Sequence, residues 1–447
     1  MKSIISSKSS NLSGKMIVPG DKSISHRSLI IGSAVTGKIT IKNLLESEDV
    51  LATANALRQL GITINKLPNN IWEVFGNGIG SLSGINNILN MGNSGTGARL
   101  LMGLVAGSDV EATFIGDESL SKRPMKRIIL PLIETGAIIE NLNNDTLPIK
   151  IKGSKITLPI EYESLISSAQ VKSSILLAGL SSLGTTSIIE PSLSRDHTER
   201  LLTFLGAKIE TTKLSDSRWK ITLHGMPSLK PSDINIPSDP SSASFPIVSA
   251  LITPNSKVKV MNVCVNDLRT GLYKTLIEMG ANIKFTNSRE INGEFIADIT
   301  AESSILNGIT VPKSRAASMI DEYPILAIAA IKAEGDTIME GIEELRYKET
   351  DRIKAVCEGL QKLGIETIDT IDSMVVKGKG SETIVNGNVD INSNLDHRIA
   401  MSFLCLGLIS ENRIRVDDTD TINSSFPFFL DKMKEIGANF EHLSVKK

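Results

Sequence analysis

The segment Leu57-Arg58-Gln59-Leu60-Gly61-Ile62-Thr63-Ile64 has the pattern of a helix that ends on a glycine and is followed at once by a strand. The same pattern returns along the whole chain, with central glycines Gly136, Gly206, Gly280, Gly364 and Gly437. One such junction is common, and chance recurrence of a frequent helix exit is the alternative explanation. Six junctions at near-equal spacing favour a chain of six similar α/β units, each with a few strands and two helices.

Two matching turns divide these units into two sets of three. Val18-Pro19-Gly20-Asp21-Lys22-Ser23 resembles Ile236-Pro237-Ser238-Asp239-Pro240-Ser241, which lies half a chain later. We therefore expect two homologous domains, one of residues 21–238 and one of residues 1–20 plus 239–447. The chain would cross between them near residues 19–22 and 237–240, and two neighbouring crossings form a natural hinge. A cleft between two homologous halves is a usual place for a ligand.

The overall composition limits the classes of partner. The chain is 41% hydrophobic and 22% charged with a net charge of -2, which is ordinary for a globular protein. Neither a nucleic acid nor a membrane surface is expected as a partner, because either would need a broad basic face. No apolar run reaches transmembrane length, and residues 1–10 lack the apolar core of a secretory signal, so we expect a cytoplasmic protein.

Cysteine and histidine spacing gives no sign of a metal site. Cys264, Cys357 and Cys405 are far apart, and an odd number of scattered cysteines fits a reducing compartment. The sequence contains no CxxC, HxxH or HExxH pattern. We therefore expect no metal ligand among its residues.

The stretch Val18–Ser28 gathers many polar groups beside an apolar helix. Lys22 and Arg27 are five residues apart with serines between them, at the start of a helix that Asp21 or Ser23 can cap. Two cations and several hydroxyls at a helix N-terminus can bind phosphate. An ordinary capped helix with a basic first turn is the alternative interpretation.

Other polar segments of the first half have the same two interpretations. Residues 91–100 contain three glycines before an apolar helix, which suits either anion-binding N–H groups or a capped turn. In residues 121–127, Pro124 is expected in the first turn of a helix, and Lys122 and Arg123 would then project from the start of that helix. A solvent-exposed charged face is the alternative. Residues 167–174 place hydroxyls and an amide at a helix start, and residues 195–200 suit a salt-bridged turn.

The second half adds acidic segments. Residues 318–326 place two acids among apolar residues at a helix start, where an acid is either a cap or a partly desolvated base. Residues 346–352 alternate in charge, and Lys348 and Arg352 would share one face if the segment is helical. Asp396-His397-Arg398 opens a very apolar helix, which indicates that its arginine points into a cleft.

Together these segments resemble the enolpyruvyl transferase family, and within it the class II pattern of the branch that acts on shikimate 3-phosphate. The resemblance spans the chain in family order, through Pro19–Arg27, Gly92–Thr96, Lys122–Pro124, Ser168–Gln170, Arg195–Glu199, Asp321–Pro324, Arg346–Arg352 and Asp396–Arg398. It implies an α/β fold of two homologous domains, each with three βαβαββ units, helices inside and sheets outside (an inside-out α/β barrel). The substrate cleft would lie between the domains.

The resemblance also implies an activity. The family branch transfers the enolpyruvyl group of phosphoenolpyruvate to the 5-hydroxyl of shikimate 3-phosphate and releases phosphate, a step toward chorismate and the aromatic amino acids. The partners would be these two small molecules. The protein would be a monomer and would need no metal and no organic cofactor.

Each matching residue acquires an implied role. The residues implied to hold phosphoenolpyruvate are Lys22, Gly95, Arg123, Gln170, Arg352 and Arg398. Those implied to hold shikimate 3-phosphate are Lys22, Ser23, Arg27, Ser168, Ala169, Gln170, Arg195, Asp321 and Lys348. The implied catalytic residues are Asp321, Glu349 and Lys22. Asp321 would take the proton of the attacking hydroxyl, whereas Glu349 and Lys22 are candidates for protonating the methylene carbon and for the later elimination.

The sequence departs from the family pattern at two places. Class I members have a lysine just before Thr-Phe-Pro in the last segment, where this chain has Asn423-Ser424-Ser425-Phe426-Pro427. At Gly95, class II members that tolerate glyphosate often have alanine. We therefore expect ordinary glyphosate sensitivity.

Two other functions stay open at this point. The sister enzymes that act on UDP-N-acetylglucosamine use a reactive cysteine in the first domain, but the expected first domain of this chain contains none. Ser121-Lys122-Arg123-Pro124 also fits the shikimate branch. A non-catalytic, repeat-built anion-binding protein is the second alternative, and it would not need Asp321 or Glu349.

Overall fold

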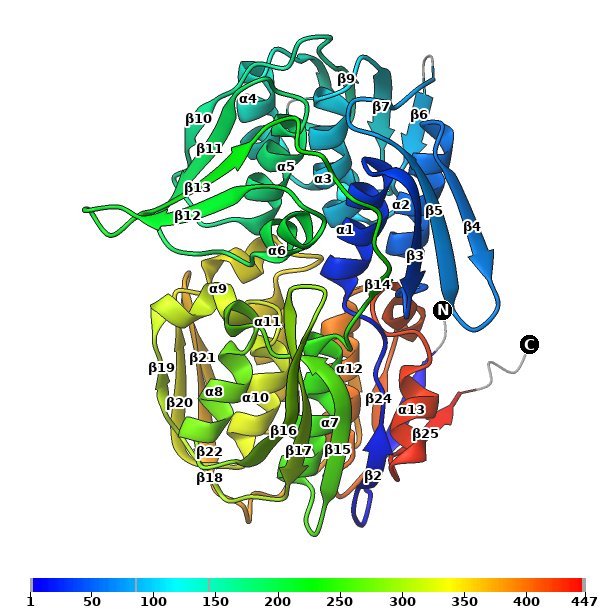
Figure 1. Cartoon of the computed structure of the whole chain (residues 1–447). Helices are drawn as coiled ribbons and strands as arrows, with labels where there is room; N and C mark the ends of the chain where they lie inside the picture. The colour runs from blue at the N-terminus through cyan, green and yellow to red at the C-terminus, as the bar shows by residue number, and fades with distance from the viewer. Residues whose placement is uncertain (1–2, 85–86, 144, 444–447) are drawn as a thin grey trace. The chain divides into compact units, whose positions relative to one another are not determined.

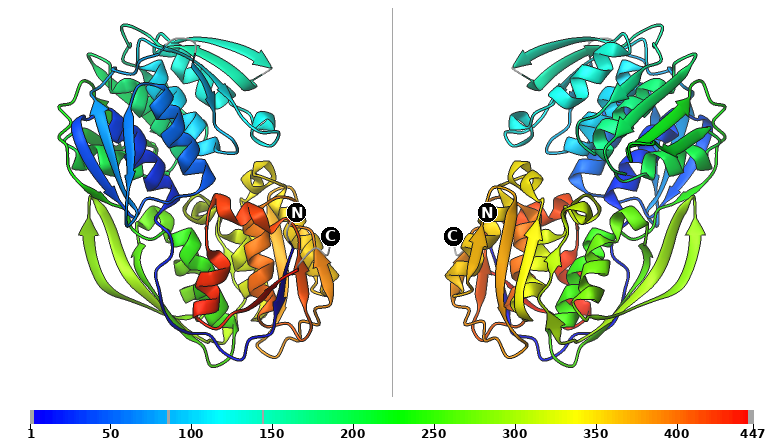
Figure 2. Two further views of the ribbon diagram at one scale, coloured as in Figure 1. Left: turned by 90° about the vertical axis from the view of Figure 1, so that its right-hand side faces the viewer. Right: turned by 90° about the vertical axis from the view of Figure 1, so that its left-hand side faces the viewer.

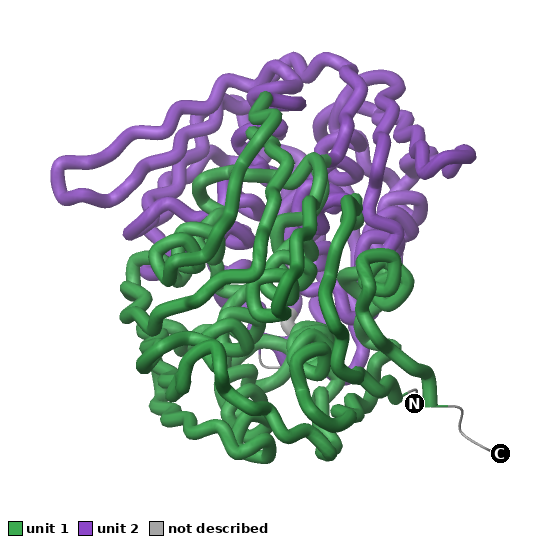
Figure 3. The backbone as a smooth tube through the Cα atoms, turned by 90° about the horizontal axis from the view of Figure 1, so that it is seen from below, with its two compact units in different colours: residues 1–19, 237–289, 295–447 green, residues 20–236, 290–294 purple. Residues whose placement is uncertain are grey.

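The computed structural model describes residues 3–84, 87–143 and 145–443, and it has a mixed α/β fold (Figure 1). The chain forms two compact units, coloured separately in Figure 3. Unit 1 contains Met1–Pro19, Pro237–Arg289 and Phe295–Lys447, and unit 2 contains Gly20–Ile236 and Glu290–Glu294. The short segment Glu290–Glu294 differs from the expected division, because it clusters with the first half of the chain. No helix in the described ranges is long and apolar enough to cross a membrane.

The six helix–glycine–strand junctions expected from the sequence are confirmed. All six glycines have positive φ, from 76° at Gly364 to 106° at Gly437, a region that other residues rarely adopt. The helices before them are α2 (Glu48–Gln59), α4 (Lys126–Glu134), α6 (His197–Phe204), α8 (Gly271–Glu278), α11 (Arg352–Lys362) and α13 (Phe429–Glu435). The strands after them are β4 (Thr63–Leu67), β8 (Ile138–Asn143), β12 (Ile209–Lys213), β16 (Asn282–Ile291), β21 (Thr367–Asp369) and β25 (Asn439–His442).

The described part of unit 2 contains three four-stranded sheets, each with one parallel and two antiparallel pairs. Their strand orders are β14-β3-β5-β4, β6-β7-β9-β8 and β10-β11-β13-β12. The other strands are β3 (Thr36–Lys42), β5 (Ile71–Asn77), β6 (Asn87–Asn90), β7 (Glu111–Ile115), β9 (Thr146–Lys152), β10 (Glu161–Glu163), β11 (Thr185–Glu190), β13 (Trp219–His224) and β14 (Ile234–Asn235). The remaining helices are α1 (Lys22–Ser33), α3 (Gly95–Ala106), α5 (Ala169–Gly179) and the 3-10 turn η1 (Leu120–Lys122).

Unit 1 repeats this arrangement with the orders β16-β17-β15-β2, β18-β20-β22-β21 and β23-β24-β1-β25, and with β19 beside β20. Its other strands are β1 (Ile4–Ser7), β2 (Ser13–Met16), β15 (Lys257–Cys264), β17 (Glu294–Glu302), β18 (Leu306–Asn307), β19 (Thr310–Val311), β20 (Ala333–Glu340), β22 (Ser373–Lys379), β23 (Val389–Ile391) and β24 (Ile414–Val416). Its other helices are α7 (Pro240–Ile252), α9 (Ala316–Met319), α10 (Tyr323–Ile331), α12 (His397–Gly407) and the 3-10 turns η2 (Asp267–Arg269), η3 (Lys313–Arg315), η4 (Glu343–Tyr347) and η5 (Thr419–Ser424).

Strands β1 and β2, near the start of the chain, lie in sheets with strands of its second half, and β14 lies in a sheet with β3 of the first half. Strand β2 pairs in parallel with β15, with Met16 opposite Val260, although the helix that follows β2 belongs to unit 2. Strand β14 pairs in parallel with β3, with Ile234 opposite Ile41, although the helix that follows β14 belongs to unit 1. Asp239 fixes one crossing by donating its N–H to the carbonyl of Pro19 at 2.9 Å.

Apolar helices form the centre of each unit. Every residue of α7, α10 and α12 is buried, and α10 packs against both of the others. In unit 2, α3 packs against α1 and α5. A helix that is apolar on all sides is stable only when it is covered on all sides. Within each unit the sheets lie outside these helices (Figure 2).

Gly364 offers a test of the junction geometry. It has a φ of 76°, and no atom of the described residues lies within 4 Å of the position that a Cβ would take. We expect Gly364→Ala to lower the free energy of unfolding by about 1 kcal/mol through backbone strain alone. Gly364→Asn should cost less, because asparagine tolerates the left-handed region. Urea denaturation measures both, and an alanine variant as stable as the parent would contradict this explanation.

Candidate functional site

Lys22 opens helix α1 of unit 2, where a cap fixes its position. Asp21 accepts the N–H of Ile24 at 2.8 Å, so Asp21 caps the helix. The Nζ atom of Lys22 lies 2.5 Å from Oδ2 of Asp49 on α2. Asp49 was not recognised from the sequence as a site residue, because it lies in an ordinary capped first turn with no cation near it in sequence.

Arg27 is a buried cation held by three helices. Its Nε and Nη2 donate to Thr198 Oγ1 and Ser173 Oγ, each at 2.7 Å, and its Nη1 donates to the carbonyl of Ser23 at 3.0 Å. The two hydroxyls lie 2.6 Å apart and come from α6 and α5. Burial lowers the pKa of Arg27 to about 10, so the guanidinium stays charged at neutral pH. We call Ser23, Arg27, Ser173 and Thr198 the hydroxyl–arginine cluster.

His26, beside Arg27, adds no charge to this region. It is fully buried, and its Nδ1 lies 2.9 Å from Thr53 Oγ1. Burial, and then the positive charges of Lys22 and Arg27, lower the pKa of His26 well below its ordinary value. The imidazole is therefore neutral at physiological pH.

Gly95 begins helix α3 between two guanidinium groups. A Cβ at Gly95 would lie 3.0 Å from Nη1 of Arg99 and 3.2 Å from Nη1 of Arg123. Arg99 donates to Gln170 Oε1 at 2.9 Å, and Gln170 Nε2 donates to Thr96 Oγ1 at 3.1 Å. Gly95, Thr96, Arg99, Arg123 and Gln170 form what we call the glycine-loop cluster. Sequence reasoning did not select Arg99, although a single arginine in a very apolar helix was an available signal.

Arg123 does not sit on a helix start. Helix α4 begins at Lys126, two residues later than the expected start at Pro124. The reason is that a following proline favours extended backbone, and Arg123 has φ −80° and ψ 134°. Its Nη2 donates to Asn93 Oδ1 at 2.7 Å, which holds the guanidinium beside the glycine loop.

The remaining candidates of unit 2 lie at the starts of α5 and α6. Ser168 caps α5 by accepting the N–H of Val171, and Ala169 and Gln170 form the first turn. Arg195 lies in the loop before α6 and is partly exposed. Its positive charge is one of the smaller contributions that lower the pKa of Arg27, which places the two cations near each other.

In unit 1 a single arginine joins three carboxylates. Arg352 is 1% exposed and contacts Asp396 Oδ2 at 2.8 Å, Glu349 Oε2 at 2.6 Å and Asp321 Oδ1 at 3.3 Å. Burial alone would lower the pKa of Arg352, but the three carboxylates outweigh burial and raise it. We call these four residues the carboxylate cluster.

Asp321 is the carboxylate of this cluster that further cations surround. It lies between α9 and α10, partly exposed, with Lys348 Nζ 3.7 Å from its Oδ1. Arg398, at the start of α12, donates to the carbonyl of Asp321 at 3.1 Å and lies 3.6 Å from Glu322 Oε1. The backbone and the side chain of Asp321 are therefore both held by cations.

Lys348 and Arg352 do not share a helix face, contrary to the expectation from their spacing. Asp351 caps α11 by accepting the N–H of Lys354 at 3.0 Å, so Lys348 and Glu349 precede the helix. Arg346 anchors this segment by donating to Asp351 Oδ2 at 2.6 Å and to the carbonyl of Ile371 at 2.9 Å. The bend still brings Lys348 and Arg352 to the same carboxylate, that of Asp321.

The predicted residues thus fall into the two units by sequence position. Unit 2 contains Lys22, Ser23, Arg27, Gly95, Arg123, Ser168, Ala169, Gln170 and Arg195. Unit 1 contains Asp321, Lys348, Glu349, Arg352 and Arg398. The first set offers cations, hydroxyls and helix N–H groups, which suit phosphate and carboxylate ligands. The second set adds carboxylates that can exchange protons.

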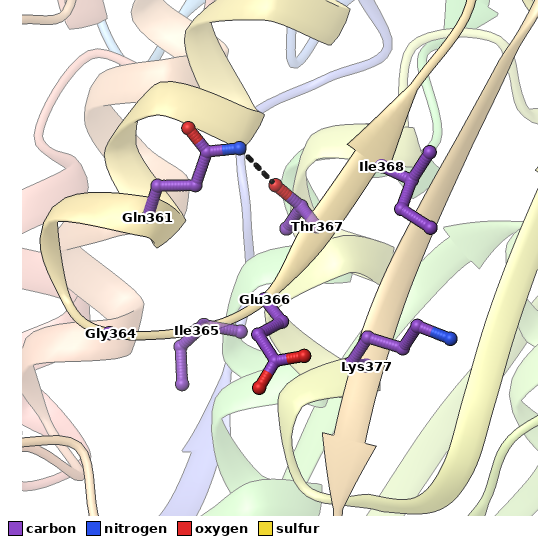
Figure 4. Close-up of a pocket in the computed structure, with 7 residues that line it drawn as sticks. All are labelled: Gln361, Gly364, Ile365, Glu366, Thr367, Ile368 and Lys377. Atoms are coloured by element: carbon purple, nitrogen blue, oxygen red, sulfur yellow. Dashed lines mark hydrogen bonds between the residues drawn. The ribbon is translucent and has the colours of Figure 1, made fainter.

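A shallow pocket of unit 1 lies elsewhere. It is lined by Gln361, Gly364, Ile365, Glu366, Thr367, Ile368 and Lys377, where α11 ends and β21 begins (Figure 4). Gln361 donates to Thr367 Oγ1 at 3.1 Å, and no candidate residue lines the pocket. Within the described ranges, no group of three or more histidine, cysteine, aspartate or glutamate side chains is arranged to hold a metal ion.

Comparisons with known proteins place this geometry in context. Residues 6–433 match the family model described as EPSP synthase (3-phosphoshikimate 1-carboxyvinyltransferase). The 3-phosphoshikimate 1-carboxyvinyltransferase of Parvibaculum lavamentivorans is 50% identical over 438 residues, which cover 98% of this chain and 97% of the relative. The solved EPSP synthase of Acinetobacter baumannii has a TM-score of 0.89 at 40% identity and covers 99% of this chain and 100% of its own. The enolpyruvyl transferase NikO of Streptomyces tendae shares the fold, with a TM-score of 0.78 at 18% identity and 99% coverage of both chains.

The carboxylate cluster predicts a stability that depends on pH. We expect Arg352→Met to lower the free energy of unfolding by about 3 to 5 kcal/mol at pH 8, because three carboxylates lose their common cation. A lower pH neutralises carboxylates that are buried without a cation, so the deficit of the variant should shrink as the pH falls toward 5.

Denaturation at both pH values checks this prediction. Arg415→Met is a matched control, because Arg415 pairs with Asp390 at the surface with side chains 45% and 74% exposed. Its effect should stay within about 0.5 kcal/mol. A deficit of Arg352→Met that is the same at pH 5 and pH 8 would show that the carboxylates do not cause it.

Proposed function

Since the chain belongs to the EPSP synthase (3-phosphoshikimate 1-carboxyvinyltransferase) family, it transfers the enolpyruvyl group of phosphoenolpyruvate to shikimate 3-phosphate, and we propose that the clusters described above carry out this transfer. The observation that most supports these roles is Asp321, a partly exposed carboxylate held by Arg352, Lys348 and Arg398. An addition to a phosphorylated enol requires a carboxylate that can accept the proton of the attacking hydroxyl and fixed cations that stabilise negative charge.

The proposed ligands of phosphoenolpyruvate are mostly cations. They are Lys22, Gly95, Arg123, Gln170, Arg352 and Arg398. Phosphoenolpyruvate carries one carboxylate and one phosphate, and guanidinium groups bind both through paired N–H donors. Gly95 leaves space between Arg99 and Arg123 into which an anionic oxygen fits. Because glycine has no side chain, this space stays open for the anion.

The proposed ligands of shikimate 3-phosphate combine hydroxyls and cations. They are Lys22, Ser23, Arg27, Ser168, Ala169, Gln170, Arg195, Asp321 and Lys348. Arg27 uses three of its five N–H donors on Thr198, Ser173 and Ser23. Two donors are left for phosphate oxygens, and the three protein contacts fix their direction.

The proposed chemistry is an addition followed by an elimination. Asp321 accepts the proton of the 5-hydroxyl while that oxygen forms a bond to C2 of phosphoenolpyruvate, and C3 receives a proton from Lys22 or Glu349. In the second step C3 loses a proton, the C2–C3 double bond forms again, and phosphate leaves with the electrons of its C2–O bond. Arg352, which contacts both Asp321 and Glu349, couples the two carboxylates electrostatically.

Asp321→Asn tests the proton-accepting role. The amide retains the size of the carboxylate but cannot take up the proton, so we expect kcat to fall by about a hundredfold or more. The assay is phosphate release from phosphoenolpyruvate and shikimate 3-phosphate, run beside UDP-N-acetylglucosamine as the alternative acceptor. Asp390→Asn, at an exposed ion pair, is the matched control and should retain normal turnover. Near-normal turnover of Asp321→Asn would remove Asp321 from the mechanism.

Gly95→Ala tests the proposed anion position. The added methyl would lie 3.0 Å from Arg99 Nη1 and 3.2 Å from Arg123 Nη1, so either a guanidinium moves or the bound anion is crowded. We expect the inhibition constant of glyphosate to rise by about tenfold or more, since one methyl in a tight site has an effect of this size. The KM for shikimate 3-phosphate serves as the internal control and should change little. Unchanged glyphosate inhibition would contradict the proposal.

A further inference from the structure

A fully buried lysine lies two residues after Gln170 and has no place in the mechanism above. Lys172 on α5 is 0% exposed, and its Nζ lies 2.7 Å from Glu199 Oε1 and 3.1 Å from Glu190 Oε1. The two carboxylates come from the start of α6 and the end of β11. We call Lys172, Glu190 and Glu199 the buried triad. It joins three elements through charged hydrogen bonds.

The buried triad also holds the loop that carries Arg195. Lys172 Nζ donates to the carbonyl of Ser194 at 3.0 Å. Glu190 accepts the N–H and the hydroxyl of Ser194, each at 2.8 Å. Three polar contacts therefore fix the residue directly before Arg195, whereas Arg195 itself is partly exposed.

The same elements surround Arg27. Ser173 is the neighbour of Lys172, and Thr198 is the neighbour of Glu199, and these two hydroxyls hold the Arg27 guanidinium. A shift of α5 against α6 would move both hydroxyls. The start of α5, with Ser168 and Gln170, would move with them. The position of the buried triad therefore affects each proposed phosphate contact of unit 2 around α5 and α6.

Stability alone is a poor explanation for this triad. Removing three charges from water is expensive, and a buried ion pair often stabilises no more than an apolar replacement would. Glu199 Oε2 is buried and has no hydrogen-bond partner among the residues that the structure describes, and burial raises the pKa of Glu199. A network with an unsatisfied oxygen is not optimised for stability, but its fixed geometry specifies where its neighbours lie.

We propose that Lys172, with Glu190 and Glu199, is a positioning network that sets the affinity for the phosphate of the acceptor substrate. It acts through Ser194 on Arg195 and through the α5–α6 register on Arg27. Lys172 touches no substrate in this view, so it is a positioning residue. The inference rests on the proposed roles of Arg27 and Arg195.

Lys172→Met is the central test, because it removes the charge and retains much of the volume. We expect the KM for shikimate 3-phosphate to rise by about tenfold to a hundredfold, the size of effect that a small misplacement of binding groups produces. The KM for phosphoenolpyruvate and kcat should change by less than about threefold. Equilibrium binding of shikimate 3-phosphate alone should weaken by the same factor as its KM.

Two further variants and one control keep the test decisive. Glu190→Gln retains one acceptor oxygen for Ser194, replaces the other with an NH2 donor and loses the charge opposite Lys172. Ser194→Ala removes one contact of the loop. Each should raise the same KM by a smaller factor. Leu223→Ala is the matched control, because Leu223 is buried in β13 beside β11 and contacts none of the triad by hydrogen bonds. It should destabilise the protein and leave both KM values unchanged.

The outcomes separate the inference from the proposed function. If folded Lys172→Met retains its KM for shikimate 3-phosphate, or raises both KM values equally, the positioning role is wrong. If Lys172→Met does not fold, Glu190→Gln and Ser194→Ala decide in the same way. If Arg195→Ala also leaves that KM unchanged, the proposed role of Arg195 itself fails. An effect of Arg195→Ala without an effect of the triad variants rejects the inference alone.

Discussion

A helix that is apolar on every side must be covered on every side, and this constraint leaves only its ends for polar groups. Most candidate residues lie at or just before the starts of helices, which are α1, α3, α4, α5 and α6 in unit 2 and α10, α11 and α12 in unit 1. Arg27 lies further along α1. The first N–H groups of a helix have no partner inside it, and the helix dipole makes this end positive. A fold with buried central helices therefore places a ready electrostatic environment where the functional side chains are.

Contacts between neighbouring helices turn this shared location into ordered clusters in both units. Gln170 on α5 reaches Thr96 on α3, and Arg27 on α1 reaches Ser173 on α5. In unit 1, Arg352 at the start of α11 reaches Asp396, the cap of α12. The clusters differ in charge, because hydroxyls surround the buried arginine of unit 2 and carboxylates surround that of unit 1. Such a difference suits one set of groups to anion binding and the other to proton transfer.

Local patterns were predictable from the sequence, and contacts between distant segments were not. The junction at Gly61 needs only a helix, a glycine and a strand, so its eight residues suffice to predict it. Lys22 and Arg27 were recognisable because they stand close together, with serines between them, at the start of a helix. Asp49 and Thr198 were missed because each becomes significant only through a partner far away in sequence. Family resemblance supplied roles, but it did not supply these partners.

The pairing of strands that lie far apart in the sequence was the other unpredicted part of the fold. The parallel pairing of β2 with β15 and of β14 with β3 follows from no local pattern, because a strand of two to four residues carries little information about its neighbour. The hairpin tip Glu290–Glu294 is a similar case. Its Glu294 lies 2.6 Å from His197 Nδ1 in unit 2, and the sequence around either residue gives no sign of this pair.

The place of β1 also orders events during synthesis. Ile4 and Ile5 are synthesised long before their partners on both sides, which lie in β24 and β25. Strand β1 must therefore wait, unpaired, until β24 and β25 have been made. Its short length of four residues limits the edge that it exposes to other nascent chains in the meantime. This sheet can thus be completed only after the strands of the other five described sheets have been synthesised.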